Sequence, residues 1–190
     1  PKLQFELALA YWTADMPDAT YETLNRLIEV AGPDNAPFYI QTGDKFLSMQ
    51  AWPPAAILYL QAVKSHAVKG RVPPELLAPF HEAVYKSAER SEALRVLPLD
   101  EILRVDEPIL LVLKARYAFF TKDFEQAYLH LDELKKLRPD MHEAILLEAE
   151  FNSFDGKSEQ ARTLLIPLAS DRSAPEWIRI FAEEIMKRLR

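Results

Sequence analysis

A short word recurs in this chain at a fixed step, and that step constrains the fold more than any other feature. Each copy begins with Glu or Gln, continues with an alanine and ends in a leucine, and the copies occupy residues 92–97, 126–131 and 160–165. The shared alanines, Ala93, Ala127 and Ala161, are separated by two steps of 34 residues. Ala115 and Ala149 keep the same step one helix earlier. Self-similarity at about 34 residues is typical of an array of helix–turn–helix units.

The cleanest unit covers residues 108–141. Its apolar residues fall at helical spacing on both sides of a polar turn at 121–123, so the unit is predicted to be two amphipathic helices. Ala115 and Ala127 are expected where the two helices cross, because a methyl group there lets the axes approach to about 8–10 Å. Residues 142–175 repeat the pattern, and Gly156 is expected to take a positive φ in the turn.

Residues 36–69 carry a third copy of the same pattern, with Gly43 as the small residue. The order is small residue, aromatic, turn, aromatic, alanine and large apolar residue, and it is seen in Gly43, Phe46, Trp52, Ala55, Tyr59 and Ala62. A matching series is Ala115, Phe124, Ala127, Leu131 and Pro139. This pattern resembles the tetratricopeptide repeat family. The resemblance implies an all-α, right-handed solenoid of about five helix–turn–helix units in a single domain over residues 1–190.

The remaining stretches fit the repeat less well. Residues 1–35 form a degenerate first unit, and residues 70–107 form an irregular third unit whose surplus length fits the loop at 68–74. Residues 176–190 are apolar on one side only and are predicted to be a C-terminal capping helix. Pro98 and Pro167 fall inside predicted second helices, so a kink or break is expected at each.

Composition argues against some classes of partner and leaves two cellular compartments possible. The chain has a net charge of −6, which argues against a nucleic-acid partner because phosphate binding needs a basic surface. It has no cysteine, so disulfides and thiolate metal sites are excluded, and the cytoplasm and a bacterial periplasm both stay open. Its apolar runs are too short for membrane insertion, so a soluble protein is expected. The chain begins with Pro1 and not with Met, and apolar residues follow soon after. We therefore expect further repeats or a partner to precede this fragment.

Motifs for catalysis are incomplete. Two His-Glu pairs, at 81–82 and 142–143, lack the second histidine that a zinc protease motif needs four residues on. Residues 156–158 read like the end of a phosphate-binding loop, but Phe151 stands where that loop needs its first glycine. We therefore expect no intrinsic enzyme, no cofactor and no metal site.

The resemblance implies a concave face built by the first helix of each unit, which would bind another protein. Phe5 and Leu9 of the first unit belong to this expected face. The candidate partner-binding residues carried over by position are Trp12, Ile40, Asp44, Leu47, Glu82, Tyr85, Val112, Arg116, Phe119, Glu150 and Phe154. The lysines and asparagines by which one subclass grips the C-terminus of heat-shock chaperones are missing, so that function is not expected. Arg116 and Glu150 are 34 residues apart and are expected to form an exposed ion pair worth about 0–1 kcal/mol.

Two functions follow as hypotheses. The first is a scaffold or adaptor whose concave groove binds an apolar or amphipathic segment of a partner protein. The alternative is self-association, in which the apolar start of the chain packs against another copy to form a homo-oligomer. The sequence does not name the partner.

Overall fold

The computed structural model describes residues 1–189, which form helices and no strand. The chain divides into two compact units, Pro1–Val105 and Asp106–Arg190, where the sequence predicts one domain. The helices of the first unit are α1 (Lys2–Thr13), α2 (Pro17–Ala31), α3 (Ala36–Ser48), α4 (Trp52–Val68), α5 (Pro74–Ser87), α6 (Ala93–Val96) and α7 (Leu99–Val105). Those of the second are α8 (Glu107–Phe120), α9 (Phe124–Leu137), α10 (His142–Phe154), α11 (Ser158–Ser170) and α12 (Glu176–Arg188). The prediction of an all-α fold is confirmed.

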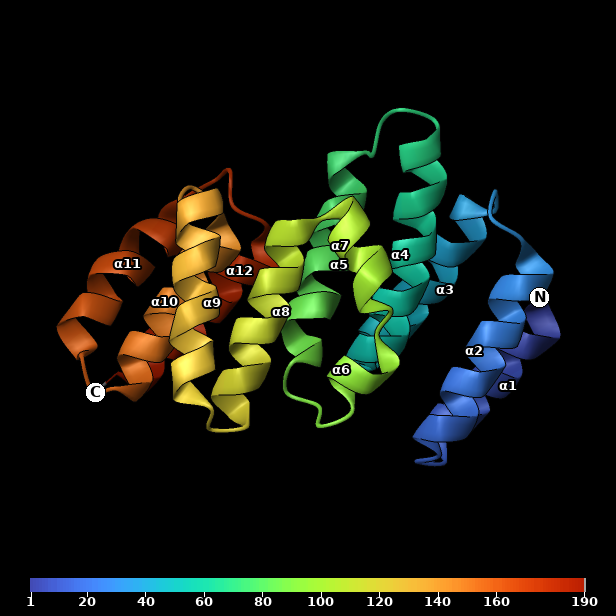
Figure 1. Ribbon diagram of the computed structural model, residues 1–190, viewed down its shortest axis with the longest axis horizontal. Helices are drawn as coiled ribbons and strands as arrows, with labels where there is room; N and C mark the ends of the chain where they lie inside the picture. Colours follow the sequence, from blue (N-terminus) through green and yellow to red (C-terminus); the bar gives the residue numbers. More distant parts are fainter. Residues whose placement is uncertain (190) are drawn as a thin grey trace. The chain divides into compact units, whose positions relative to one another are not determined.

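Neighbouring helices pack in pairs, α1 with α2 and α3 with α4 in the first unit, and α8 with α9 and α10 with α11 in the second (Figure 1). Small residues are buried where these pairs meet, among them Ala115 and Ala127, as the repeat predicts. Gly43 is the tightest case, because a Cβ atom there would lie 3.1 Å from Cε1 of Tyr59. A side chain at position 43 would therefore have to push the tyrosine ring aside.

The turns inside these four pairs share one backbone geometry. One residue of each turn has a positive φ, namely Asp15, Gln50, Lys122 and Gly156, at 56°, 58°, 66° and 74°. The next residue then donates its N–H to the carbonyl five residues earlier, over 2.8–2.9 Å in all four turns. This is the hydrogen bond of a Schellman motif, which closes a helix and reverses the chain. The predicted positive φ at Gly156 is confirmed, and three non-glycine residues adopt the same conformation.

The third repeat departs from this scheme, as its irregular spacing predicts. The turn after α5 uses short-range hydrogen bonds from Ala88, Glu89 and Arg90 and contains no left-handed residue. The expected second helix is split into α6 and α7 by Pro98, because the residue before a proline favours extended backbone, and Leu97 has a ψ of 136°. The predicted break at Pro98 is confirmed.

Pro167 has a different outcome, since α11 runs through it from Ser158 to Ser170. A kink or a break was expected here, and the break is wrong because the helix continues past the proline. Both Pro167 and Thr163, whose carbonyl loses its helical donor, lie at exposed positions. Water can therefore satisfy that carbonyl, which is how a proline is tolerated inside a helix.

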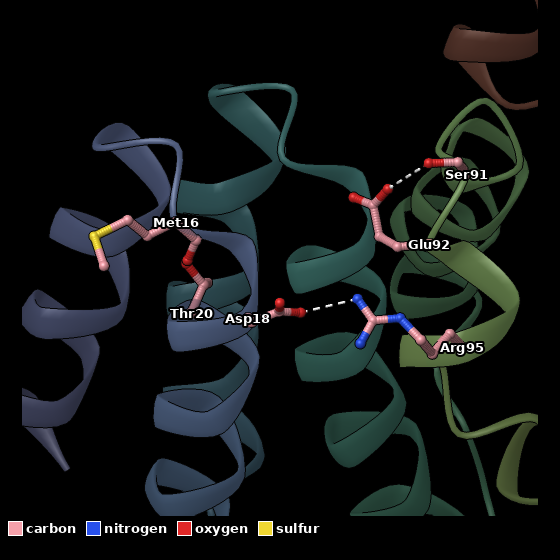
Figure 2. A network of polar contacts seen from close by, with 6 residues as sticks. All are labelled: Met16, Asp18, Thr20, Ser91, Glu92 and Arg95. Atoms are coloured by element: carbon pink, nitrogen blue, oxygen red, sulfur yellow. Dashed lines mark hydrogen bonds and ion pairs between the residues drawn. The ribbon is translucent and has the colours of Figure 1, made fainter.

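One ion pair joins the short helix α6 to α2 (Figure 2). Nη2 of Arg95 donates to Oδ1 of Asp18 over 2.8 Å, and the Ser91 hydroxyl donates to the neighbouring Glu92 carboxylate over 3.4 Å. On α2 itself, the Thr20 hydroxyl donates to the carbonyl of Met16, so this side chain serves its own helix. Arg95 and Asp18 are both exposed, so solvent screens the ion pair and it adds little to stability.

The last helix, α12, packs against α10 and α11. Its buried side includes Trp177, Ile178 and Ile185, while Glu183 and Glu184 are exposed. This is the one-sided pattern predicted for a helix that covers the apolar face of its neighbours.

The loop before α12 contains a strongly hydrogen-bonded carboxylate. Asp171 accepts bonds from the Ser173 hydroxyl at 2.7 Å and the Ser173 N–H at 2.8 Å, and its other oxygen lies 3.1 Å from Nε2 of His142. These bonds favour the charged form and lower the pKa of Asp171 to about 2. Because the pKa is lowered on folding, the contribution to stability is present above the ordinary value of 3.8 and is lost as pH falls through about 2.

We expect Ser173→Ala to raise the pKa of Asp171 toward its ordinary value, because the first and largest of these bonds is removed. Carboxyl-detected NMR titration of the full chain measures this directly. Ser170→Ala is the matched control, since the Ser170 hydroxyl donates to the carbonyl of Ile166 and not to Asp171. Equal Asp171 titration in both variants would contradict the assignment.

Candidate functional site

The first unit contains a groove between α1 and α3 with a cavity volume of about 560 Å³, which lies within the roughly 300–1,000 Å³ of ligand pockets. Its lining residues are Lys2, Phe5, Glu6 and Leu9 on α1 and Phe38, Gln41, Thr42 and Lys45 on α3. On each helix the four positions follow the spacing i, i+3, i+4, i+7, so each set forms one face of its helix. The two sets are related residue by residue by a step of 36.

Buried aromatic side chains fix the rotation of the two helices that form this groove. The Phe5 ring meets the buried Phe46 ring edge-on, with centroids 5.9 Å apart, and so connects α1 to α3. Tyr39 is buried, and its hydroxyl donates to the carbonyl of Gly32 at 2.7 Å, just beyond the end of α2. With Tyr39 and Phe46 held inside, α3 presents its face with Phe38 and Lys45 to the groove.

The groove has an apolar floor and a charged rim. Phe5, Leu9 and Phe38 are half-buried, so each leaves part of its apolar surface open to solvent. The Thr42 hydroxyl donates to the carbonyl of Phe38 at 2.8 Å and is used inside its own helix. A ligand in this groove would therefore contact apolar side chains at the floor and charged side chains at the rim.

Four exposed polar side chains form that edge: Lys2, Glu6, Gln41 and Lys45. Within residues 1–189, none of the four makes a hydrogen bond or ion pair through its side chain. The groove can thus offer two ammonium groups, one carboxylate and one amide to a partner.

The predicted site residues of α3 lie beside this groove and not in it. Asp44 accepts a hydrogen bond from the Tyr59 hydroxyl at 2.5 Å and so faces α4. Burial, together with this carboxylate, raises the pKa of Tyr59, so the phenol stays protonated and keeps donating. Ile40 and Leu47 are half-buried and do not line the cavity.

The predicted residues Trp12, Glu82 and Tyr85 are also separated from the groove. Trp12 lines a smaller cavity of about 140 Å³ with Asp15, Pro17, Arg90 and Glu92, and the Arg90 guanidinium lies 5.7 Å from its ring centroid. Glu82 accepts from Nζ of Lys86 at 2.8 Å. Tyr85 is fully buried on α5, so the expectation that its side chain faces a partner is not met.

The second unit gathers five phenylalanines where α8 ends, α9 begins and α10 ends. We call Phe119, Phe120, Phe124, Phe151 and Phe154 the phenylalanine cluster. Phe119 lies at its centre, stacked on Phe151 with centroids 4.2 Å apart and meeting Phe154 edge-on at 4.9 Å. Phe119 and Phe154 were both expected to bind a partner. Of the two, only Phe154 is exposed to solvent, with 64% of its surface accessible. Phe119 is buried because its ring fills the space between α8 and α10.

Val112 and Arg116, also expected on a partner-facing surface, are buried on α8. Val112 is fully buried, so it packs in the core and not on a partner-facing surface. Arg116 is 1% exposed and Glu150 is 17% exposed, so the expectation of an exposed ion pair between them is wrong. The pair itself is present, and it is a buried one.

The Arg116 guanidinium makes two parallel hydrogen bonds to Glu150. Nε donates to Oε2 at 2.8 Å and Nη2 donates to Oε1 at 2.9 Å, so α8 and α10 are joined by a bidentate pair. Cζ of Arg116 also lies 4.9 Å from the ring centroid of Phe120 and 5.5 Å from that of Phe181 on α12. Both distances are within the range of a cation–π interaction. This arrangement ties three helices together.

The described residues form neither a metal site nor a membrane-spanning helix. Across residues 1–189 no group of three or more His, Asp or Glu side chains is placed to hold a metal ion. In the same part of the chain no helix combines the length and apolar character needed to cross a bilayer. The groove between α1 and α3 is taken as the candidate site because its volume exceeds that of the Trp12 cavity and that of a cavity of about 370 Å³ lined by Ile28, Ile57 and Pro98. In comparisons with known proteins, the chain matches no family model, no curated protein and no solved structure.

Proposed function

We propose that this chain is a helical-repeat interaction module of the tetratricopeptide type, which acts as an adaptor and not as an enzyme. The groove between α1 and α3 holds an apolar or amphipathic segment of a partner protein. The observation that carries the proposal is the pair of equivalent helix faces, spaced i, i+3, i+4, i+7, that leaves Phe5, Leu9 and Phe38 half-open. The four matching turns and the buried small residues support the family assignment. The right-handed solenoid stays a prediction.

This groove suits a segment of protein more than a small polar metabolite. Its apolar side chains come from two helices and form an elongated surface, which is how an amphipathic helix is bound in a groove. Burying the apolar anchors of a partner against such a surface contributes about 1.5–3 kcal/mol per fully buried large side chain, before the cost of ordering. Micromolar binding needs about 8 kcal/mol, so two or three anchors supply a large part of it and rim contacts supply the rest.

We expect Phe38→Ala to weaken partner binding by about tenfold or more, because truncating an aromatic anchor that lines a groove costs about 1.4 kcal/mol or more. Affinity capture with the full chain as bait identifies the partner, and titration of that partner with wild type and variant gives the ratio. Ile180→Ala is the matched control, since Ile180 is an exposed apolar residue on α12 in the other unit. Equal loss in both variants, or no loss in either, would reject this groove.

A second candidate function, self-association, is favoured by another face of α1. Leu3 and Leu7 are four residues apart, so they share a face, and they are 79% and 39% exposed. If two copies pack through this face, sedimentation of the wild type should show a mass that rises with concentration. Leu3→Asp/Leu7→Asp should then return the monomer. If the wild type has the mass of one chain at all concentrations, self-association is ruled out.

A further inference from the structure

Charges around the groove between α1 and α3 indicate which segments it prefers. We infer that the occupant is an amphipathic segment with acidic residues beside its apolar face, and this inference rests on the proposed function. Two of the three charged lining residues are lysines, Lys2 and Lys45, and the third is Glu6. The rim is therefore net positive, on a chain whose overall charge is −6.

Within residues 1–189, the two groove lysines have no carboxylate partner. Acidic residues outnumber basic ones by 29 to 23, and several lysines elsewhere are paired. Nζ of Lys64 lies 2.7 Å from Glu101, and Nζ of Lys135 lies 2.7 Å from Glu148. Lys2 and Lys45 make no such pair to any residue of 1–189, although Glu6 follows Lys2 by one helical turn. Their ammonium groups are free to meet carboxylates on a bound segment.

The apolar floor explains why the occupant must be amphipathic. Phe5, Leu9 and Phe38 offer no hydrogen bond, and Thr42 uses its hydroxyl within α3. A segment with only acidic residues would desolvate its charges against this floor without compensation. A segment with an apolar stripe flanked by Glu or Asp instead covers the floor and brings its carboxylates to the rim.

The net negative charge of the chain does not reverse this preference at physiological salt. Charges in solvent are screened over a Debye length of about 8 Å at 0.15 M, so distant carboxylates act weakly on a segment in the groove. Lys2, Lys45 and Glu6 line the groove itself and decide the local sign. Complementary charges of this kind give specificity against wrong partners more than they give raw affinity.

Three labelled peptides of about 18 residues, roughly five helical turns, test the inference. They share one leucine and phenylalanine face and carry glutamate, glutamine or lysine beside it. Fluorescence anisotropy at about 0.15 M salt measures their binding to the full chain. We expect the glutamate peptide to bind about tenfold tighter than the lysine peptide, from a few exposed ion pairs.

Lys2→Glu/Lys45→Glu should remove that preference, whereas Lys69→Glu/Lys136→Glu should keep it. The control lysines are exposed and lie outside the groove, and both variants change the net charge equally. If the three peptides bind equally well and Phe38→Ala weakens their binding, the acidic preference is overturned and the proposed function stands. Equal effects of the two lysine variants would also overturn the preference. If no peptide binds the wild type, both the inference and the proposed groove are overturned.

Discussion

Arg116→Ala should destabilise the second unit by about 3–5 kcal/mol, the cost of removing one partner from a buried ion pair. The substitution leaves the Glu150 carboxylate in a site that is only 17% exposed, without the two guanidinium bonds at 2.8 and 2.9 Å. It also removes the cation from the Phe120 and Phe181 rings, so α12 loses one of its attachments. Because the chain has two compact units, hydrogen exchange in residues 106–189 under denaturant is the measurement that isolates this change.

Two comparisons test the physical reason for that loss. Arg26→Ala removes an ion pair with Glu22 whose side chains are 62% and 67% exposed, so we expect a change within about 0.5 kcal/mol. Arg116→Leu/Glu150→Leu removes both charges and should recover much of the stability lost in Arg116→Ala. If the single and double variants are equally unstable, lost packing and not the loss of the two guanidinium bonds to Glu150 causes the effect.

Phe151→Ala should destabilise the same unit by about 3–5 kcal/mol, as expected for truncating a fully buried aromatic side chain. The Phe151 ring is fully buried, stacked on Phe119 at 4.2 Å and met edge-on by Tyr128 at 5.3 Å. Removing it leaves a cavity between α8, α9 and α10 that the fixed helix backbones fill only in part. Thermal and denaturant unfolding, with hydrogen exchange in residues 106–189, measure the loss.

Phe154→Ala is the matched control for this effect. It belongs to the same phenylalanine cluster and meets Phe119 at 4.9 Å, but most of its surface is exposed. Truncation therefore removes little buried area, and we expect a change of roughly 0.5 kcal/mol or less. A loss in Phe154→Ala as large as in Phe151→Ala would show that the cluster is stabilised at its open edge and not at its centre.

The features that could be predicted from the sequence are those that local chemistry decides. The 34-residue step identified paired helices, the small residues at their crossings and the turn at Gly156, because helical spacing and glycine conformation are local properties. The break at Pro98 follows from the restricted backbone of the preceding residue. The outcome at Pro167 was harder to predict. A helix continues through a proline when solvent reaches the freed carbonyl, here that of residue 163. That access depends on tertiary packing.

Phe5 and Leu9, which were expected on the partner-facing side of α1, do line the groove, but the sequence did not predict the rotation of α3. On α3 the family pattern selects Ile40, Asp44 and Leu47, whereas the groove is lined by Phe38 and Lys45. The rotation depends on which residues are buried, and Tyr39 and Phe46 decide it through contacts with other helices. The lining positions of α1 and α3 are 36 residues apart but carry different residue types, so no sequence pattern marks them.

The proposed groove is tested most directly by photo-crosslinking from within it. Gln41 is exposed, lines the groove and makes no side-chain hydrogen bond within residues 1–189, so a benzophenone amino acid can replace it with little effect on folding. The same photoreactive residue in place of Ile180 serves as the control. We expect the residue at position 41 to crosslink a partner segment rich in apolar and acidic residues, and Phe38→Ala to reduce that yield. Crosslinks formed only from position 180, or a yield at position 41 that Phe38→Ala does not change, would contradict the account.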